Sequence, residues 1–205
     1  MKLNSRPKSV VWHEHKICFM HVNKAASNSI NHAMGRTFGP PDEKVPAEIL
    51  PHDYFIFSFV RNPWERIVSS YAHNIVQGKL TGPQKARGFT RRMDLPHFVG
   101  LIIETPDKLA DKHTVSQTYR LANEDGEPIP SWVGKVENIG ACWGNLSRML
   151  NVRTGRHLEA LPWMKNRSRF RDRIPPNDLT NMALRRSFEL RFRPDYIALK
   201  YEVAR

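Results

Sequence analysis

Residues 17–38 read ICFMHVNKAASNSINHAMGRTF, and this stretch decides the fold. Residues 17–22 are almost continuously apolar, as expected of a strand that is buried on both faces. A run of small polar residues follows at 23–29, and apolar residues then recur at helical spacing until the GPP sequence at 39–41 ends the pattern. The stretch therefore predicts a strand, a tight loop and a helix.

The same unit recurs at residues 54–60, YFIFSFV, which form the strongest predicted strand. Arg61 ends this strand, Asn62 is suited to cap a helix, and Pro63 suits the first helical turn. Two strand–loop–helix units in succession predict parallel strands with helices packed against them. We therefore expect an α/β fold, a P-loop-like three-layer sandwich in which helices flank a central parallel sheet.

The rest of the chain is expected to complete one domain over residues 1–205. A loose basic tail is expected at 1–9 and a mobile, exposed basic loop at 78–93. A third strand is predicted at 132–137. The remaining helices are predicted at 95–103, 106–121, 139–150 and 178–192.

The chain is strongly basic, with a net charge of +12 over 205 residues and a pI near 10.0. Such an excess attracts polyanions, among them nucleic acid, an acidic glycan, an anionic membrane surface or a polyphosphorylated nucleotide. Two cysteines, Cys18 and Cys142, are too few for a disulfide framework, which favours a cytoplasmic protein. No apolar run resembles a signal peptide or approaches the roughly 18 to 20 residues of a membrane span.

The loop at 23–29 has the features of a phosphate-binding site. Backbone N–H groups at a helix N-terminus attract anions, Lys24 adds a full charge, and Ser27, Asn28 and Ser29 add side-chain donors. A P-loop kinase would need glycines here and a carboxylate for Mg²⁺ at a strand end. Residues 17–24 hold no glycine, and the strand at 54–60 ends in Arg61. These features favour direct anion binding over ATP chemistry.

Both loops resemble motifs of the PAPS-dependent sulfotransferases, which use 3′-phosphoadenosine-5′-phosphosulfate (PAPS). The sequence KAASNSI from Lys24 resembles their 5′-phosphosulfate loop, and residues 59–71, FVRNPWERIVSSY, resemble their 3′-phosphate motif. Weaker similarities to the carbohydrate-type branch follow at 132–139 and 161–168. The sequence departs from the family at Asn23, where proline is common, and at Lys135, where arginine is usual.

The resemblance implies sulfuryl transfer from PAPS to an acceptor, with a carbohydrate or another hydroxyl or amine as the acceptor and without a metal ion. It makes Lys24 a catalytic residue that stabilises charge on the leaving phosphate. Ser69 lies eight residues after Arg61, about two helical turns, so both residues are expected to bind one phosphate. The donor-binding residues are then Lys24, Ala25, Ala26, Ser27, Asn28, Ser29, Arg61 and Ser69.

The base that takes the acceptor's proton is less well defined. His52, just before the second predicted strand, is the first candidate, followed by His113 and His21. His113 lies in a stretch that resembles a family segment near the acceptor pocket. Trp64, Trp132 and Trp163 are candidate stacking platforms, although core packing is the commoner role of tryptophan.

Three alternatives stay open at this point. A nucleotide-dependent phosphotransferase would share the strand–loop–helix units but lacks its glycines and its strand-end carboxylate. A nucleic-acid-binding protein would explain the charge, yet no recognition-helix, zinc or RNP-type motif occurs in the sequence. A family member that binds the nucleotide without catalysis would keep both loops.

Overall fold

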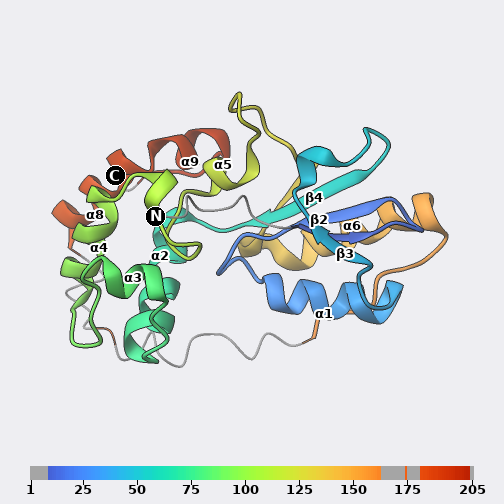
Figure 1. Cartoon of the computed structure of the whole chain (residues 1–205). Coiled ribbons are helices and arrows are strands. Elements are labelled where there is room, and N and C mark those ends of the chain that lie inside the picture. Colours follow the sequence, from blue (N-terminus) through green and yellow to red (C-terminus); the bar gives the residue numbers. More distant parts are fainter. Residues whose placement is uncertain (1–8, 163–173, 175–180, 204–205) are drawn as a thin grey trace. The chain divides into compact units, whose positions relative to one another are not determined.

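The computed structural model describes residues 9–162, 174 and 181–203. The chain divides into two compact units (Figure 1). Within the described residues, the sheet unit comprises 9–61 and 120–162, and the helical unit comprises 62–119, 174 and 181–203. Each unit has a hydrophobic core of its own. The single domain expected over residues 1–205 stays a prediction.

A five-stranded sheet forms the centre of the sheet unit. Its strand order is β3-β1-β2-β4-β5. The strands are β1 (Ser9–Trp12), β2 (Ile17–Met20), β3 (Glu43–Val45), β4 (Phe55–Val60) and β5 (Trp132–Lys135). The three strands predicted from the sequence are thus confirmed, as β2, β4 and β5.

The sheet is mixed, which corrects the prediction of a parallel one. Strands β2, β4 and β5 are parallel, but β1 pairs antiparallel with both β2 and β3. A tight turn joins β1 to β2, in which the Lys16 N–H donates to the His13 carbonyl over 3.0 Å, and this turn reverses the chain. Residues 1–8 lie outside the described residues, and Ser9, expected in a loose tail, is the first residue of β1.

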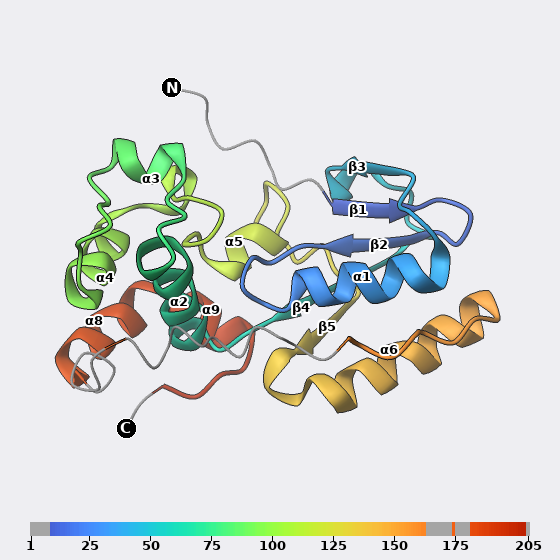
Figure 2. The same ribbon diagram turned by 90° about the horizontal axis from the view of Figure 1, so that it is seen from below.

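Helices α1 (Ser27–Phe38) and α6 (Ile139–Thr154) pack on the same face of this sheet (Figure 2). One core joins both helices to that face, and it contains Val10, Trp12, Ile17, Phe19, Ile30, Ala33, Met34, Phe38, Phe57, Phe59, Trp143, Leu146 and Leu150. Cys18 is buried and carries a free thiol, whose pKa burial raises to about 12. The structure is therefore α/β, and the predicted three-layer sandwich is not confirmed.

The helical unit is built around α2 (Pro63–Tyr71), which continues into a π-helical turn at Ala72–Val76. Its other helices are α3 (Gly82–Ala86), α4 (Leu95–Glu104), α8 (Met182–Arg191) and α9 (Arg193–Ala198), and α5 (Gln117–Leu121) begins within it. Short 3-10 turns occur at Ala47–Ile49, Asp107–Leu109 and Val136–Asn138. Side chains from α2, α4, α8 and α9 form one core. No helix in the described part of the chain could span a membrane.

Two segments differ from their predicted structure. The expected loop at 78–93 contains α3, where Thr81 and Gln84 form a capping box and Gln84 is buried. The helix predicted over 106–121 is interrupted between Leu109 and Gln117, where side-chain carboxylates accept the backbone N–H groups of residues 113, 116 and 117. The last predicted helix is present as α8, and residues 178–180 lie outside the described residues.

Candidate functional site

The carboxyl ends of three parallel strands meet at one edge of the sheet unit. Met20 of β2 pairs with Ser58 of β4, and Val60 of β4 pairs with Lys135 of β5. The loop with Lys24 follows β2, Arg61 follows β4, and Lys135 ends β5. The structure therefore brings cations from three neighbouring strands to the edge where open α/β sheets bind their ligands.

The first loop contains backbone conformations that residues other than glycine rarely adopt. Lys24 and Ala26 have φ angles of 69° and 60°, in the left-handed region that favours glycine. A hydrogen bond from the Ala25 N–H to the Val22 carbonyl (3.2 Å) closes the turn. Such strained residues concentrate at ligand-binding sites. The loop thus bends as a glycine-containing loop would, although it holds no glycine.

The helix that follows this loop begins without a cap. Ala26 is its N-cap and offers no side-chain acceptor, and the first turn has no acidic residue. The first backbone bond is from the Ile30 N–H to the Ala26 carbonyl (3.1 Å). Within the described residues, the N–H groups of residues 27–29 have no partner. Uncapped N–H groups and the helix dipole form a site for an anion.

The second loop is built differently. The Asn62 Oδ1 accepts a hydrogen bond from the Glu65 N–H (3.2 Å), and Pro63 is the first residue of α2, as predicted. Because Pro63 has no N–H and the Glu65 N–H is already paired, this helix terminus offers fewer backbone donors to an anion than α1 does, and its contribution to anion binding rests mainly on side chains. Ser69 lies half-buried on α2 in the helical unit, while Arg61 belongs to the sheet unit. Their joint binding of one phosphate stays a prediction.

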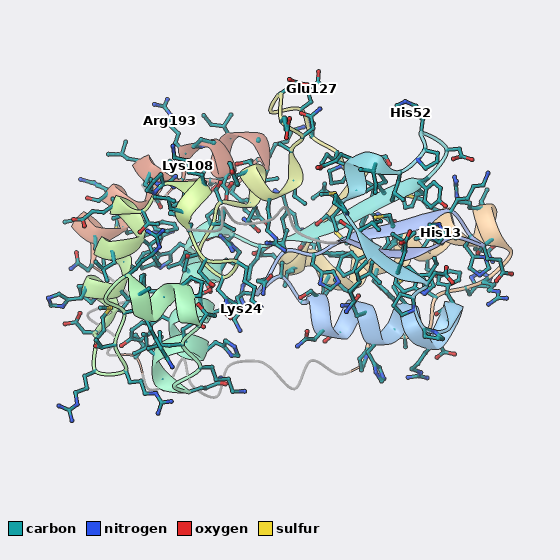
Figure 3. All side chains as sticks on the ribbon, viewed as in Figure 1. His13, Lys24, His52, Lys108, Glu127 and Arg193 are labelled. Atoms are coloured by element: carbon teal, nitrogen blue, oxygen red, sulfur yellow. The ribbon has the colours of Figure 1, made fainter. Side chains whose placement is uncertain are left out.

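His52 lies at the wrong edge of the sheet for the role predicted for it. It is exposed and precedes β4, whereas Arg61 follows β4 at the opposite end. Because β2 runs parallel to β4, Lys24 and Arg61 follow their strands at the same edge. Figure 3 shows Lys24 well away from His52. The structure does not bring His52 to Lys24, and we do not retain His52 as the base.

His21 lies on the expected side of the sheet, directly after β2. Its Nε2 is within hydrogen-bond distance of the Asn31 amide (2.9 Å), and its carbonyl accepts a bond from Arg120 Nε (2.7 Å). Burial lowers the pKa of His21, the nearby charges of Arg120 and Lys44 lower it further, and the Asn31 bond opposes them. Sequence reasoning missed Arg120 because only folding brings it to this edge.

His113 lies buried in the helical unit beside a carboxylate. Its Nδ1 is 2.8 Å from Asp111 Oδ1, and Asp111 Oδ2 accepts a bond from Thr81 Oγ1 over 2.9 Å. Burial alone would raise the pKa of Asp111, but the bonds from His113 and Thr81 bring it below its usual value. The pair is thus an ionised carboxylate that fixes an imidazole. Nothing in the sequence pattern singled out Asp111.

The tryptophans within the described residues pack in the two cores. Trp64 is 3% exposed and meets Phe188 edge-on, with ring centroids 5.4 Å apart. Trp132 packs edge-on against Phe59, and a Cβ on Gly134 would lie 2.6 Å from that phenylalanine ring. Trp163 lies outside the described residues. Core packing therefore explains Trp64 and Trp132.

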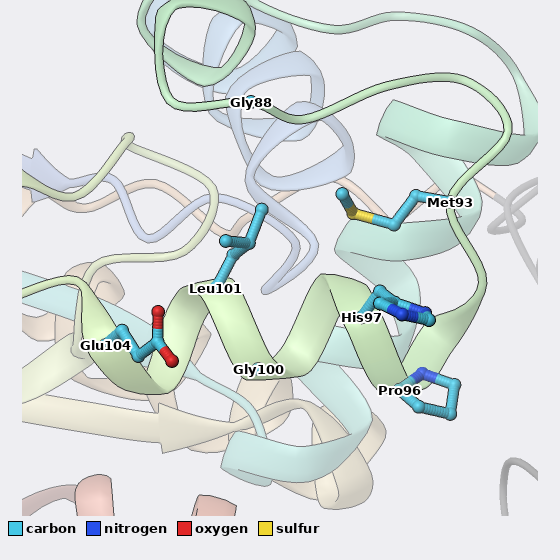
Figure 4. Close-up of a pocket in the computed structure, with 7 residues that line it drawn as sticks. All are labelled: Gly88, Met93, Pro96, His97, Gly100, Leu101 and Glu104. Atoms are coloured by element: carbon cyan, nitrogen blue, oxygen red, sulfur yellow. The ribbon is translucent and has the colours of Figure 1, made fainter.

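An open groove of about 510 Å³ lies along α4 in the helical unit (Figure 4). Gly88, Met93, Pro96, His97, Gly100, Leu101 and Glu104 line it. None of the predicted site residues is among them. The described residues contain no group of three or more His, Cys, Asp or Glu side chains placed to hold a metal ion.

The comparisons with known proteins agree with the family resemblance of the two loops. A family model described as the sulfotransferase family matches residues 7–201. No curated protein and no solved structure matches the chain. The match covers Lys24 and Arg61 together with nearly all of the described residues. Neither a phosphotransferase nor a nucleic-acid-binding protein would explain a match of this extent. The chain therefore belongs to the sulfotransferase family.

Proposed function

We propose that the protein transfers a sulfuryl group from PAPS to a hydroxyl of a carbohydrate or glycoconjugate. Membership of the sulfotransferase family supports sulfuryl transfer in general. The observation that carries the donor is the uncapped start of α1 beside Lys24, with Arg61 at the same edge of the sheet. These groups suit an anion with phosphates at two positions.

Each donor-binding residue has a distinct role in this proposal. The N–H groups of residues 27–29, with the Ser27 and Ser29 hydroxyls, bind the 5′-phosphosulfate. Arg61 supplies a planar fork of donors to the 3′-phosphate, and Ser69 adds a hydroxyl. Ala25 and Ala26 contribute backbone shape, and the small side chain at the N-cap leaves room for the ligand.

Lys24 carries the main catalytic role. As the sulfur–oxygen bond to the 5′-phosphate breaks, negative charge accumulates on the bridging oxygen, and the ammonium of Lys24 stabilises it. The donor's products are adenosine 3′,5′-bisphosphate and the sulfated acceptor. This chemistry requires a group that removes the acceptor's proton, for which His21 and His113 remain candidates.

The proposal is tested by transfer of radioactive sulfate from ³⁵S-labelled PAPS to a mixture of chemically desulfated polysaccharides. We expect label in the polysaccharide fraction, and its loss in Lys24→Ala. Arg153→Ala is the control, because Arg153 lies in the same unit near the opposite edge, where it donates to the His15 carbonyl. Label transferred equally by wild type and Lys24→Ala would contradict the proposal. Binding of adenosine 3′,5′-bisphosphate without any turnover would identify a nucleotide binder that lacks catalysis.

A further inference from the structure

His21 begins the β2–α1 loop of the sheet unit, residues 21–26, and is held from two sides. It follows β2 directly and precedes Lys24 by three residues. Its carbonyl accepts a hydrogen bond from Arg120 Nε over 2.7 Å, and its Nε2 lies 2.9 Å from the amide nitrogen of Asn31. Arg120 and Asn31 belong to the same unit as His21. One residue thus joins the end of β2 to α1 through its side chain and to Arg120 through its backbone.

The β2–α1 loop needs such support because its backbone is strained. Lys24 and Ala26 have φ angles of 69° and 60°. Residues other than glycine persist in this region only where the surrounding structure holds them there. The bond from the Ala25 N–H to the Val22 carbonyl closes the turn, and these two residues are 1% and 0% exposed. Those contacts fix the middle of the loop, and the bonds of His21 fix its start.

The imidazole of His21 is packed as well as hydrogen-bonded. Its ring centroid lies 4.8 Å from that of Phe19, and the residue is half-buried. Asn31 Oδ1 lies 3.1 Å from the same Nε2 that is 2.9 Å from Asn31 Nδ2. Because the amide offers both an acceptor and a donor, it can pair with either neutral tautomer. Asn31 is one turn beyond Ser27, the first residue of α1, so this bond ties the start of α1 to the end of β2.

The charges around His21 do not favour a proton on its ring. The charged groups that act on it are Arg120 and Lys44, and both lower its pKa, as burial does. A general base at this position would hold the acceptor's proton beside two cations, which disfavour the imidazolium. The surroundings of His21 therefore suit a residue that holds a loop better than one that accepts a proton.

We propose that Arg120 and Asn31 are positioning residues that act through His21 and hold the β2–α1 loop in the shape that binds the donor's 5′-phosphosulfate. This inference rests on the proposed sulfuryl transfer. The loop that carries Lys24 and leads into α1 is then arranged before the donor binds. A loop that is ordered in advance loses less conformational entropy on binding, which raises affinity. Since the proposed function assigns the 3′-phosphate to Arg61, the effect is confined to the 5′ side of the nucleotide.

The test compares adenosine 3′,5′-bisphosphate with adenosine 3′-monophosphate, which differ only in the 5′-phosphate. The ratio of the two affinities is the 5′-phosphate preference, and displacement calorimetry measures it. Arg120→Ala and Asn31→Ala should each lower this preference by about three- to tenfold and leave the affinity for the monophosphate unchanged. Arg120→Lys, whose ammonium can still donate to a carbonyl, should retain most of the preference.

Two controls in the same unit match these variants. Arg153→Ala removes an arginine whose Nε also donates to a backbone carbonyl, that of His15, over 3.4 Å near the opposite edge of the sheet. Asn145→Ala removes an exposed asparagine from α6. Neither control should change the 5′-phosphate preference. A loss of the same size in the controls would show a general effect on the unit and overturn the inference.

The double variant Arg120→Ala/Asn31→Ala tests whether the two residues act through His21. Its loss of preference should be smaller than the product of the two single losses, because either change alone already releases the start of the loop. Losses that multiply would show two independent effects and overturn the positioning claim.

NMR titration of the His21 imidazole reports the contact with Arg120 directly. Without the charge of Arg120 the pKa of His21 should rise, and Arg153→Ala should leave it in place. An unchanged pKa of His21 in Arg120→Ala would contradict the contact on which the inference depends.

The remaining outcomes separate this inference from the proposed function. A wild-type 5′-phosphate preference in both Arg120→Ala and Asn31→Ala would overturn the inference and leave the proposed function intact. A fall in kcat of about 100-fold in His21→Ala with an unchanged preference would identify His21 as the base and also overturn the inference. A wild-type protein that binds neither nucleotide would overturn the proposed function and this inference together.

Discussion

The two helices that follow β2 and β4 begin in opposite ways. Helix α1 starts at Ala26, an N-cap with a φ of 60° and no side-chain acceptor. Helix α2 starts at Asn62, whose side chain accepts the Glu65 N–H over 3.2 Å. A side-chain cap stabilises a helix by about 1 kcal/mol, and a left-handed residue other than glycine costs a similar amount. The first helix forgoes this stabilisation and the second one has it.

The difference indicates which helix terminus receives an anion through its backbone. Donors that are already satisfied bind no ligand, whereas the N–H groups of residues 27–29 are unpaired within the described residues. At α2 the proposed function assigns ligand binding to side chains, Arg61 before the helix and Ser69 within it. In that proposal the two strand–loop–helix units make two different kinds of contact with the nucleotide.

The largest expected effect comes from the charge in the first loop. Lys24→Ala should lower kcat by about 100- to 1,000-fold, as removal of a donor to a developing negative charge does. Affinity for adenosine 3′,5′-bisphosphate should fall far less, because the backbone donors of α1 remain. Steady-state turnover of PAPS and calorimetry on the same preparation measure the two effects. A proportional loss of both would assign Lys24 to binding alone.

A carboxylate at the N-cap of α1 should remove the anion binding that distinguishes the start of α1 from the start of α2. Ala26→Asp places a negative charge where the 5′-phosphate binds, so affinity for adenosine 3′,5′-bisphosphate should fall by about tenfold or more. Ala26→Asn is the matched control, because asparagine has nearly the same shape, tolerates a positive φ and carries no charge. Calorimetry compares the two variants. Equal affinities would refute anion binding at this terminus.

Removing the cap of the second helix should change stability and not binding. Asn62→Ala should destabilise the protein by about 1 kcal/mol, the usual value of a lost N-cap. Denaturant unfolding measures the stability, and calorimetry should give an unchanged affinity for adenosine 3′,5′-bisphosphate. A large fall in affinity without a fall in stability would show that Asn62 binds the ligand.

The smallest expected effect is a pH dependence of stability that comes from His21. Since burial, Arg120 and Lys44 lower its pKa, the native state favours the neutral imidazole. The contribution of His21 to stability is therefore fully present above about pH 6.5, the ordinary histidine pKa, and is lost as the pH falls below that value. Thermal unfolding between pH 7.5 and 5 should show that His21→Gln loses less stability with falling pH than wild type does. His52→Gln, which changes an exposed histidine of the same unit, should keep the wild-type slope.

Strong local patterns made much of the fold predictable. Strands β2, β4 and β5 and helices α1 and α2 follow from apolar runs and helical spacing. Strand β1 was missed because it has four residues beside a basic tail, and its pairing depends on the turn at residues 13–16. The helix predicted over 106–121 is interrupted where the Asp107 and Asp195 carboxylates accept the N–H groups of residues 116 and 117, and no local pattern reveals the contact with Asp195.

The candidate site was predictable where its residues are close in sequence. Lys24 and Arg61 directly follow buried strands, so chain direction places them at the same edge. His52 precedes its strand, and the same rule places it at the other edge. Bonds between Arg66 and His113 or between Arg120 and His21 join residues far apart in sequence. Spacing and periodicity do not reveal such bonds.

The most direct test of the account is calorimetry of two nucleotides against wild type and Arg61→Ala, with a chelator present. Adenosine 3′,5′-bisphosphate and adenosine 5′-monophosphate differ only in the 3′-phosphate. We predict that wild type prefers the bisphosphate by about 10- to 150-fold, the scale of a charge-assisted bond of 1.5 to 3 kcal/mol. Arg61→Ala should lose most of this preference, because only the Ser69 hydroxyl then remains for the 3′-phosphate. A preference of wild-type size in Arg61→Ala, or no binding of the bisphosphate by wild type, would contradict the central claim.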